Sequence, residues 1–179
     1  MKAIVVYESL FGNTGRVAGV IARCLETVAE VELASVLDAD PQGAAGVDLV
    51  VVGGPTHMHG MSWSFTRKST VDKDGNEAAA TGPGVREWLD KLPKGNGILA
   101  AAFDTRADGS RLLLGAASEP IARRLRKHGY RLIVPPESFI VTDTEGPLKA
   151  GEVERADAWA HRIAQQLEGM ARAPAAAAS

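Results

Sequence analysis

The residues best suited to chemistry lie near the N-terminus, between an apolar run and an amphipathic segment. They are Ser9, Leu10, Phe11, Gly12, Asn13 and Thr14. A phosphate needs several backbone N–H donors converging on one point, and the start of a helix supplies them with the positive end of its dipole. Gly12 lets the backbone approach closely, and the side chains of Ser9, Asn13 and Thr14 can donate further hydrogen bonds. The segment therefore predicts a phosphate-binding loop.

The same residues exclude some nucleotide loops and leave one plain alternative. The segment contains no Lys, so a Walker-type loop does not apply, and the Gly-x-Gly-x-x-Gly dinucleotide pattern is absent from it. The alternative is an ordinary strand-to-helix turn in which Asn13 or Ser9 caps the helix, because both residue types are favoured at that position.

Two other segments carry polar residues directly after apolar runs. The first runs from Gly53 to Gly60 and includes Pro55, Thr56, His57, Met58 and His59. Two histidines without a carboxylate cluster are a weak metal signal, so we predict no metal site there. The second runs from Phe103 to Ser110 and includes Asp104, Thr105 and Arg106.

Alternating strand and helix patterns position these three segments. Strands are predicted over 3–7, 28–35, 47–52 and 98–103, with a fifth over 130–134 and 138–141 that two prolines interrupt. Helices are predicted over 13–27, 85–92, 112–128 and 151–170. This order indicates an α/β fold, a doubly wound five-stranded parallel sheet with ligand sites at the carboxyl ends of its strands.

The region from 56 to 84 lacks a clear period. It is long for a loop, which predicts a lid over a site or a mobile flap, centred on 61–82. Within it, residues 72–76 superficially suggest a calcium loop, but the order of ligands and the final Glu of an EF-hand are missing.

Composition limits the class of protein. With 179 residues and 45% hydrophobic content, we expect one domain over 1–170 and a disordered tail over 171–179. A net charge of −2, with both signs interspersed, lacks the basic footprint of a nucleic-acid partner. The first apolar run is too short for a signal peptide or membrane span, so we expect a cytoplasmic protein. The single cysteine, Cys24, is expected to be a buried apolar residue of the first helix.

The loop after the first strand reads Tyr-x-Ser-x-x-Gly-Asn-Thr, from Tyr7 to Thr14. This pattern resembles the phosphate loop of the flavodoxin family, particularly the flavodoxin modules of flavodiiron proteins and related quinone reductases. The resemblance extends over nearly the whole chain. It implies a sheet of order 2-1-3-4-5 with FMN at the ends of strands one, three and four. Flavodoxins often carry Ser or Thr where Leu10 and Phe11 stand, so the backbone would make the contacts there.

The resemblance also implies which residues border the flavin ring. The segment from Gly53 to Gly60 resembles the Gly-x-Pro-Thr loop, whose amides reach the N5 and O4 edge and whose glycine permits a peptide rearrangement. Met58 or Trp63 is a candidate to pack on the ring. The second ring loop would be Phe103, Asp104, Thr105 and Arg106. Phe103 is the only aromatic residue there, and it can instead belong to the core.

Arg106 is the most suggestive charge. Near N1 and O2 of the flavin it would stabilise the negative charge of the reduced ring and favour two-electron chemistry. The alternative is a solvated Arg paired with Asp104 or Asp108, since exposed pairs form readily. Arg67 is a second candidate for contacting an anionic substrate.

Three functions remain open. The first is an FMN-dependent oxidoreductase, similar to a quinone reductase, acting on a small-molecule acceptor. The second is an electron-transfer carrier that docks on a redox partner, although carriers usually have a strongly acidic face and a net charge of −2 fits that poorly. The third is a flavodoxin-fold binding or interaction module that has lost flavin. The resemblance also makes a homo-oligomer an open question, because flavodoxin-like reductases often assemble so that a neighbour covers the flavin.

Overall fold

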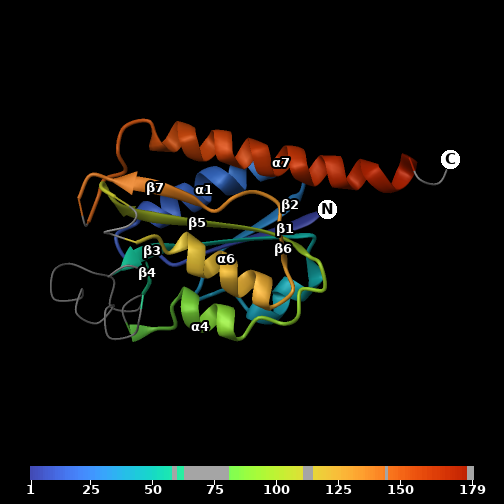
Figure 1. Ribbon diagram of the computed structural model, residues 1–179, viewed down its shortest axis with the longest axis horizontal. Helices are drawn as coiled ribbons and strands as arrows, with labels where there is room; N and C mark the ends of the chain where they lie inside the picture. The colour runs from blue at the N-terminus through green and yellow to red at the C-terminus, as the bar shows by residue number, and fades with distance from the viewer. Residues whose placement is uncertain (58–59, 63–80, 111–114, 144, 177–179) are drawn as a thin grey trace.

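A computed structural model of the chain describes residues 1–57, 60–62, 81–110, 115–143 and 145–176 (Figure 1). Its centre is a sheet in which the strands run in the order β2-β1-β3-β5-β6. The main strands are β1 (Lys2–Tyr7), β2 (Glu30–Ser35), β3 (Leu49–His57) and β5 (Leu99–Ala107). They pair in parallel, so the predicted doubly wound order is confirmed.

The edge of the sheet next to β5 is divided between two strands. Both β6 (Arg131–Leu132) and β7 (Glu137–Val141) pair in parallel with β5. Pro135 and Pro136 lie between them. Proline has no N–H to donate to a ladder, so the predicted fifth strand is interrupted where the sequence indicated. A short strand, β4 (Gly60–Met61), pairs antiparallel with the end of β3 and was not predicted.

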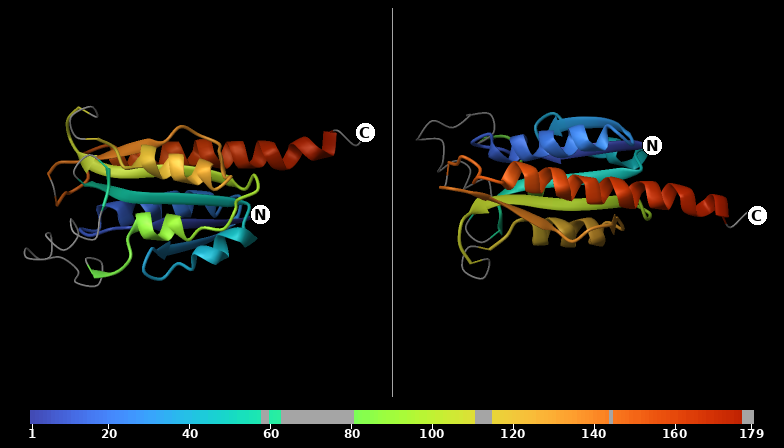
Figure 2. Two further views of the ribbon diagram at one scale, coloured as in Figure 1. Left: turned by 60° about the horizontal axis from the view of Figure 1, so that its bottom comes forward. Right: turned by 90° about the horizontal axis from the view of Figure 1, so that it is seen from above.

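Helices cover both faces of the sheet. In Figures 1 and 2, α1 (Asn13–Leu25) and α7 (Glu152–Ala176) lie on one face, and α4 (Val85–Asp90) and α6 (Ser118–Lys127) lie on the other. A 3-10 helix, η1 (Pro41–Gly46), connects β2 to β3. Side chains alternate along the strands, so Val5 and Val51 pack under α1 and α7 while Val6 and Val52 pack under α4 and α6.

The apolar spacing of α1 accounts for its position. Val17, Ile21 and Leu25 recur at intervals of one turn and are fully buried. Cys24 belongs to the same packed cluster, with 7% of its surface exposed, as predicted. Trp88 and Trp159 are also buried.

Polar contacts attach the start of α7 to the edge of the sheet. Arg155 donates to the carboxylates of Glu152 and Glu137 and to the carbonyl of Ser138. Its guanidinium also lies 5.5 Å from the centre of the Phe139 ring. This contact set holds α7 against β7, beside the ends of the strands.

Four element boundaries differ from the prediction by more than two residues. β3 continues past Val52 to His57 and β5 continues past Phe103 to Ala107, because the two strands stay paired as far as Pro55 and Thr105. The polar side chains there end the apolar pattern but leave the backbone ladder intact. α6 begins at Ser118 rather than at 112, after Gly115 adopts a φ of 74° that a helix does not tolerate. α7 continues past Met170 to Ala176: Ala171, Arg172 and Ala173 favour the helix, and Pro174 stands in its last turn.

Residues 63–80, most of the predicted flap, lie outside the described residues, as do 177–179 of the predicted tail. Across the described ranges, no helix combines the length and apolar character needed to cross a membrane.

Candidate functional site

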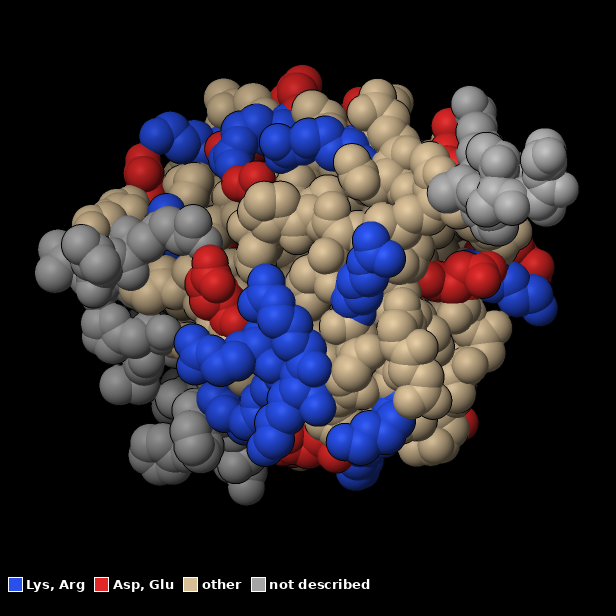
Figure 3. Space-filling view, turned by 45° about the vertical axis from the view of Figure 1, so that its right-hand side comes forward, with Lys and Arg blue, Asp and Glu red and all other residues tan. Residues whose placement is uncertain are grey.

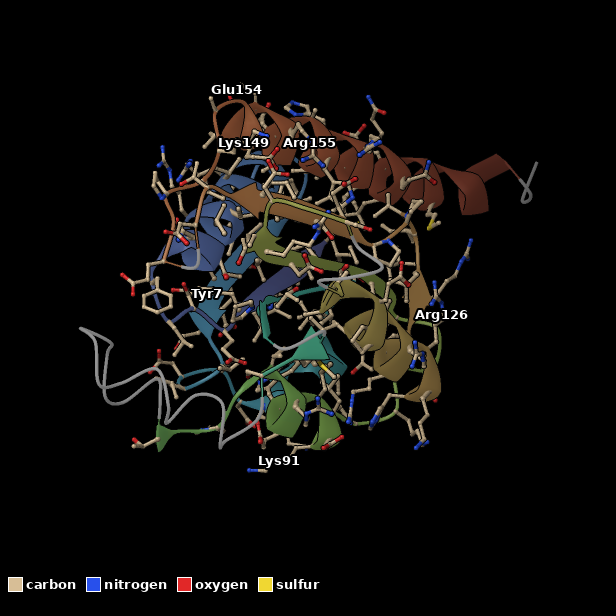
Figure 4. The ribbon with its side chains drawn as sticks, turned by 60° about the vertical axis from the view of Figure 1, so that its left-hand side comes forward. Tyr7, Lys91, Arg126, Lys149, Glu154 and Arg155 are labelled. Atoms are coloured by element: carbon tan, nitrogen blue, oxygen red, sulfur yellow. The ribbon has the colours of Figure 1, made fainter. Side chains whose placement is uncertain are left out.

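The carboxyl ends of β1, β3 and β5 meet at one end of the sheet. Figure 4 looks toward this end, with Tyr7 labelled at the end of β1. A cavity of about 190 Å³ opens here. It is lined by Ser9, Leu10, Phe11, Asn13, Thr14, Pro55, Thr56, Thr105, Arg106, Ala107 and Val141. The fold thus gathers residues from all three predicted segments at one place.

The loop after β1 offers unused backbone donors. The first backbone hydrogen bond of α1 runs from the N–H of Arg16 to the carbonyl of Gly12, at 2.9 Å. The amides from Ser9 to Gly15 donate to no other group in the described parts of the chain. Gly12 adopts a φ of 82°, a left-handed conformation that favours glycine, and so turns the chain into the helix. The result is a row of free N–H groups at a helix N-terminus.

Two polar side chains of this loop already have protein partners. The Asn13 amide donates to the carbonyl of Glu145 at 2.8 Å and contacts the backbone at Gly146, where an added Cβ would lie 2.2 Å from it. The Thr14 hydroxyl lies 2.7 Å from the hydroxyl of Thr105, and both residues are buried. These side chains therefore hold the loop against β5 and the 145–147 turn, and the phosphate contacts of Asn13 and Thr14 stay a prediction.

Ser9 differs from both of them. Its hydroxyl oxygen is buried and has no hydrogen-bond partner in the described structure. A buried polar atom without a partner is unfavourable unless a ligand satisfies it. The helix begins without a side-chain cap, so the alternative of a capped strand-to-helix turn has no hydrogen bond to support it within the described residues.

Glu8, the residue before Ser9, is buried and turned to the other side of β1. One carboxylate oxygen accepts from the hydroxyl of Ser62 at 2.5 Å, and the other accepts from the N–H of Val85 at 2.7 Å. Glu8 thereby ties the loop to the residue after β4 and to the start of α4. Sequence patterns did not indicate this role.

The loop after β3 contributes fewer describable contacts. Pro55 and Thr56 line the cavity, and the Thr56 hydroxyl accepts from the N–H of Ala117 at 2.9 Å. His57 pairs with Gly60 through the backbone. The predicted residues Met58 and His59 lie outside the described residues, as do the ring candidate Trp63 and Arg67.

Phe103 and Asp104, predicted to bind the cofactor, are fully buried instead. The Phe103 ring packs edge to face against Phe139 and Trp159, with centroids 6.2 Å from each. It also occupies the space beside Gly53, where an added Cβ would lie 2.0 Å from the ring. The alternation of β5 directs Phe103 into the core under α7, so it cannot stack on a ligand at the surface.

Asp104 faces the opposite side of the sheet. One of its oxygens accepts from the N–H of Ser118 at 2.7 Å, at the start of α6, and the other has no partner among the described residues. Burial raises the pKa of this carboxyl, against the lowering effects of Ser118, Ser138 and Arg106. Asp104 therefore accepts a hydrogen bond at the start of α6 and does not line the cavity.

Arg106 lines the cavity, and no ion pair among the described residues supports the alternative of a pairing with Asp104 or Asp108. Its guanidinium donates to the carbonyls of Ala107 at 3.3 Å and Gly109 at 2.7 Å, and its buried Nε has no partner in the described structure. Asp108 pairs instead with Lys149, at 2.6 Å, which lowers the pKa of the aspartate. Carbonyl groups orient the Arg106 charge without neutralising it.

A second, larger cavity of about 550 Å³ lies on the other side of the same loop. It is lined by Tyr7, Glu8, Ser9, Leu10, Gly12, Gly15, Ser35, Val36, Leu37, Asp38 and Pro83. The end of β2 therefore also borders the candidate site. The rule that ligands bind at the carboxyl ends of parallel strands is the signal that could have indicated this border.

A parallel sheet of order 2-1-3-4-5, with its cavity at the loop between β1 and α1, defines the flavodoxin-like class of doubly wound α/β proteins. Comparison with solved structures agrees. A flavodoxin from the domain Archaea superposes with a TM-score of 0.65 at 21% identity, covering 94% of this chain and 99% of its own. The chain therefore has the flavodoxin-like fold.

Two further structures are similar at the same level. A WrbA-like flavodoxin protein from Agrobacterium tumefaciens has a TM-score of 0.57 at 21% identity, over 94% of this chain and 98% of its own. The Flv1 flavodiiron core from Synechocystis has a TM-score of 0.62 at 14% identity, over 95% of this chain and 36% of its own. No protein-family model matches the sequence, and no curated protein matches it significantly.

Proposed function

We propose that this protein is an FMN-binding redox flavoprotein whose β1–α1 loop holds the phosphate. The observation that carries the proposal is the run of free amides from Ser9 to Gly15, together with the buried, unpartnered hydroxyl of Ser9. Such a donor set suits a dianionic phosphate, which accepts several hydrogen bonds at once and is attracted by the helix dipole. The flavodoxin-like fold of the chain supports the same proposal.

Charge at the loop is compatible with an anion. The first turn of α1 contains no acidic residue. The nearest carboxylate in sequence, Glu8, accepts hydrogen bonds from Ser62 and Val85 on the other side of β1. The phosphate would therefore meet N–H donors without a carboxylate from the first turn of α1 opposing it.

The cavity beside the loop suits only part of FMN. Its volume of about 190 Å³ is below the roughly 300 to 1,000 Å³ of a pocket that encloses a drug-sized ligand. We propose that it takes the phosphate and sugar-alcohol chain, with the ring at its open edge against Pro55 and Thr56. Phe11 is the aromatic residue among the lining residues, and it is half-buried.

Arg106 supports an oxidoreductase more than a low-potential carrier. Bound FMN would supply the capacity to accept one or two electrons. A fixed positive charge at the cavity would stabilise negative charge on the reduced ring, because a partly buried site screens charges weakly. Figure 3 also shows Lys and Arg side chains gathered on the face that carries the end of α6, whose last turn holds Arg124, Arg126 and Lys127. This patch lies at the amino-terminal ends of the strands, away from the cavity, and the net charge of −2 fits the strongly acidic face of a carrier poorly. We therefore propose reduction of a small-molecule acceptor, similar to that of quinone reductases.

A second candidate is a flavodoxin-fold interaction module without flavin. It is favoured by the burial of Phe103, which removes the only aromatic residue of the predicted second ring loop, and by the protein partners of Asn13 and Thr14. Under this alternative the free amides of the loop would bind water or a simple anion.

Titration of the flavin-free protein with FMN and with riboflavin separates the two candidates. Riboflavin carries the same ring without the phosphate. We expect FMN to bind, with quenched flavin fluorescence, and at least about tenfold more tightly than riboflavin, equivalent to about 1.4 kcal/mol. Ser9→Ala should reduce this preference, while Thr27→Ala, just after the far end of α1 and outside both cavity linings, should not. Failure of FMN to bind would support the interaction module, and equal affinity for the two flavins would contradict the phosphate loop.

A further inference from the structure

A cluster of three metal-ligating side chains lies away from the flavin site, where α1 packs beside α7. These two helices cover the same face of the sheet and contribute to one hydrophobic cluster (Figures 1 and 2). Cys24 comes from the last turn of α1, and Asp157 and His161 come from α7. Their ligand atoms all lie within 4.8 Å of one another.

Helix geometry explains why the three residues meet. Asp157 and His161 are four positions apart and therefore project from the same face of α7. Cys24 lies in the packed contact between the helices, 7% exposed, while the side chains of His161 and Asp157 are 61% and 54% exposed. The sulfur is therefore buried beneath the other two ligands, which lie at the surface where an ion can reach them.

We propose that Cys24, Asp157 and His161 bind a zinc ion. The Cys24 sulfur lies 3.4 Å from Nδ1 of His161, and the same nitrogen lies 3.3 Å from a carboxylate oxygen of Asp157. Ligand atoms around a tetrahedral zinc are about 3.3 to 3.6 Å apart, given bonds of about 2.3 Å to sulfur and about 2.0 Å to nitrogen or oxygen. Two of the three distances between ligand atoms, sulfur to nitrogen and nitrogen to oxygen, therefore already match those around zinc. The exposed Asp157 side chain can adjust the third, between sulfur and oxygen.

The hydrogen bonds within the cluster do not explain it fully. Nδ1 of His161 also lies 2.9 Å from the backbone carbonyl of Asp157, so three potential partners surround one ring nitrogen. An imidazole nitrogen carries either one hydrogen or one lone pair, so it can satisfy only one of these partners well. Zinc would take the place of the hydrogen on Nδ1, so the ring would exchange its contact with the Asp157 carbonyl for a bond to an ion shared with the sulfur and the carboxylate.

The chemical types of the three ligands indicate which metal would bind. A thiolate with an imidazole favours zinc over magnesium or calcium, which prefer oxygen ligands. Zinc binds cysteine as the thiolate, so the Cys24 thiol loses its proton when the ion binds. Binding therefore exchanges one proton for one zinc ion at the sulfur, and water completes the tetrahedron. The bound ion would join the end of α1 to α7.

The first test is a zinc titration of the reduced, full-length protein in competition with a chromophoric chelator. We expect one zinc per chain, and affinity at least about tenfold weaker in His161→Gln and Asp157→Asn, because losing a ligand should cost no less than losing the group that orients one. Both side chains are exposed, so these variants should fold. His128→Gln, at the C-terminal end of α6 on the other face of the sheet, is the matched control.

A second readout identifies the sulfur. Cobalt bound in place of zinc should give a sulfur-to-cobalt charge-transfer band in a difference spectrum, and Cys24→Ser should abolish that band. Zinc should also raise the melting temperature of the wild-type protein and not that of His161→Gln. The proposal is overturned if no zinc binds, if the cobalt complex lacks the thiolate band, or if His128→Gln weakens binding as much as His161→Gln.

Discussion

The hydroxyl of Thr14, in the first turn of α1, lies 2.7 Å from the hydroxyl of Thr105 in β5, and both side chains are buried. The residues are 91 positions apart in the sequence. Their contact fastens the N-terminus of α1 to the strand that carries Arg106. The donor loop and the charged strand of the proposed flavin site are thereby held in one fixed relationship.

Thr14→Val should destabilise the flavin-free protein by about 1 to 3 kcal/mol, because it leaves the Thr105 hydroxyl buried without its partner. The double variant Thr14→Val/Thr105→Val should be less destabilised than the sum of the single variants, since no orphaned hydroxyl remains. Urea denaturation of the four proteins measures this coupling. Simple additivity would show that the hydrogen bond contributes little.

Phe11→Ala should weaken FMN binding by about 1 to 3 kcal/mol if the ring of Phe11 packs on the flavin, by analogy with stacking on nucleobases. The unfolding free energy should change little, because Phe11 is only half-buried. Phe103→Leu provides the comparison: it alters the fully buried aromatic cluster and should lower stability without a specific effect on FMN affinity. If Phe103→Leu weakens FMN binding and Phe11→Ala does not, the flavin ring contacts β5 and not the loop after β1.

Asp104→Asn should stabilise the protein relative to the wild type, and by a larger margin at pH 7 than at pH 4. Burial raises the pKa of Asp104 above 3.8, so the folded wild type holds the proton more tightly than the unfolded chain does. The stability of the wild type therefore falls as pH rises from the unfolded value through the raised folded value, whereas asparagine does not titrate. The asparagine oxygen can still accept from Ser118. Urea unfolding at the two pH values tests the prediction, and a constant difference between the proteins would contradict it.

Arg106→Gln should lower the reduction potential of bound FMN, because the charge that stabilises the reduced ring is removed. Arg16→Gln is the matched control, since Arg16 is an exposed residue of the first turn of α1 and does not line the cavity. Potentials are measured by equilibration with a reference dye. Equal shifts in the two variants would indicate only a long-range effect of net charge and would remove Arg106 from the mechanism.

Local pattern was sufficient for the strands and for the donor loop. The apolar runs, the helical spacing of α1 and the position of Gly12 predict the strands and a turn into a helix N-terminus, because these features depend on neighbouring residues. The order of the strands in the sheet was implied by the resemblance to flavodoxins. Pro135 and Pro136 likewise mark the interruption of the last strand through their own chemistry.

The tertiary structure decided which side chains remain available to bind a ligand. Phe103 and Arg106 belong to the same strand, yet pairing with β3 and β7 directs Phe103 into the core while Arg106 lines the cavity. Asn13 and Thr14 form hydrogen bonds with residues far along the chain, and Cys24 lies beside Asp157 and His161 only because α1 packs beside α7. A sequence pattern describes which hydrogen bonds a residue can donate or accept. Whether that capacity is already satisfied depends on contacts between distant segments, which arise only when the chain is folded.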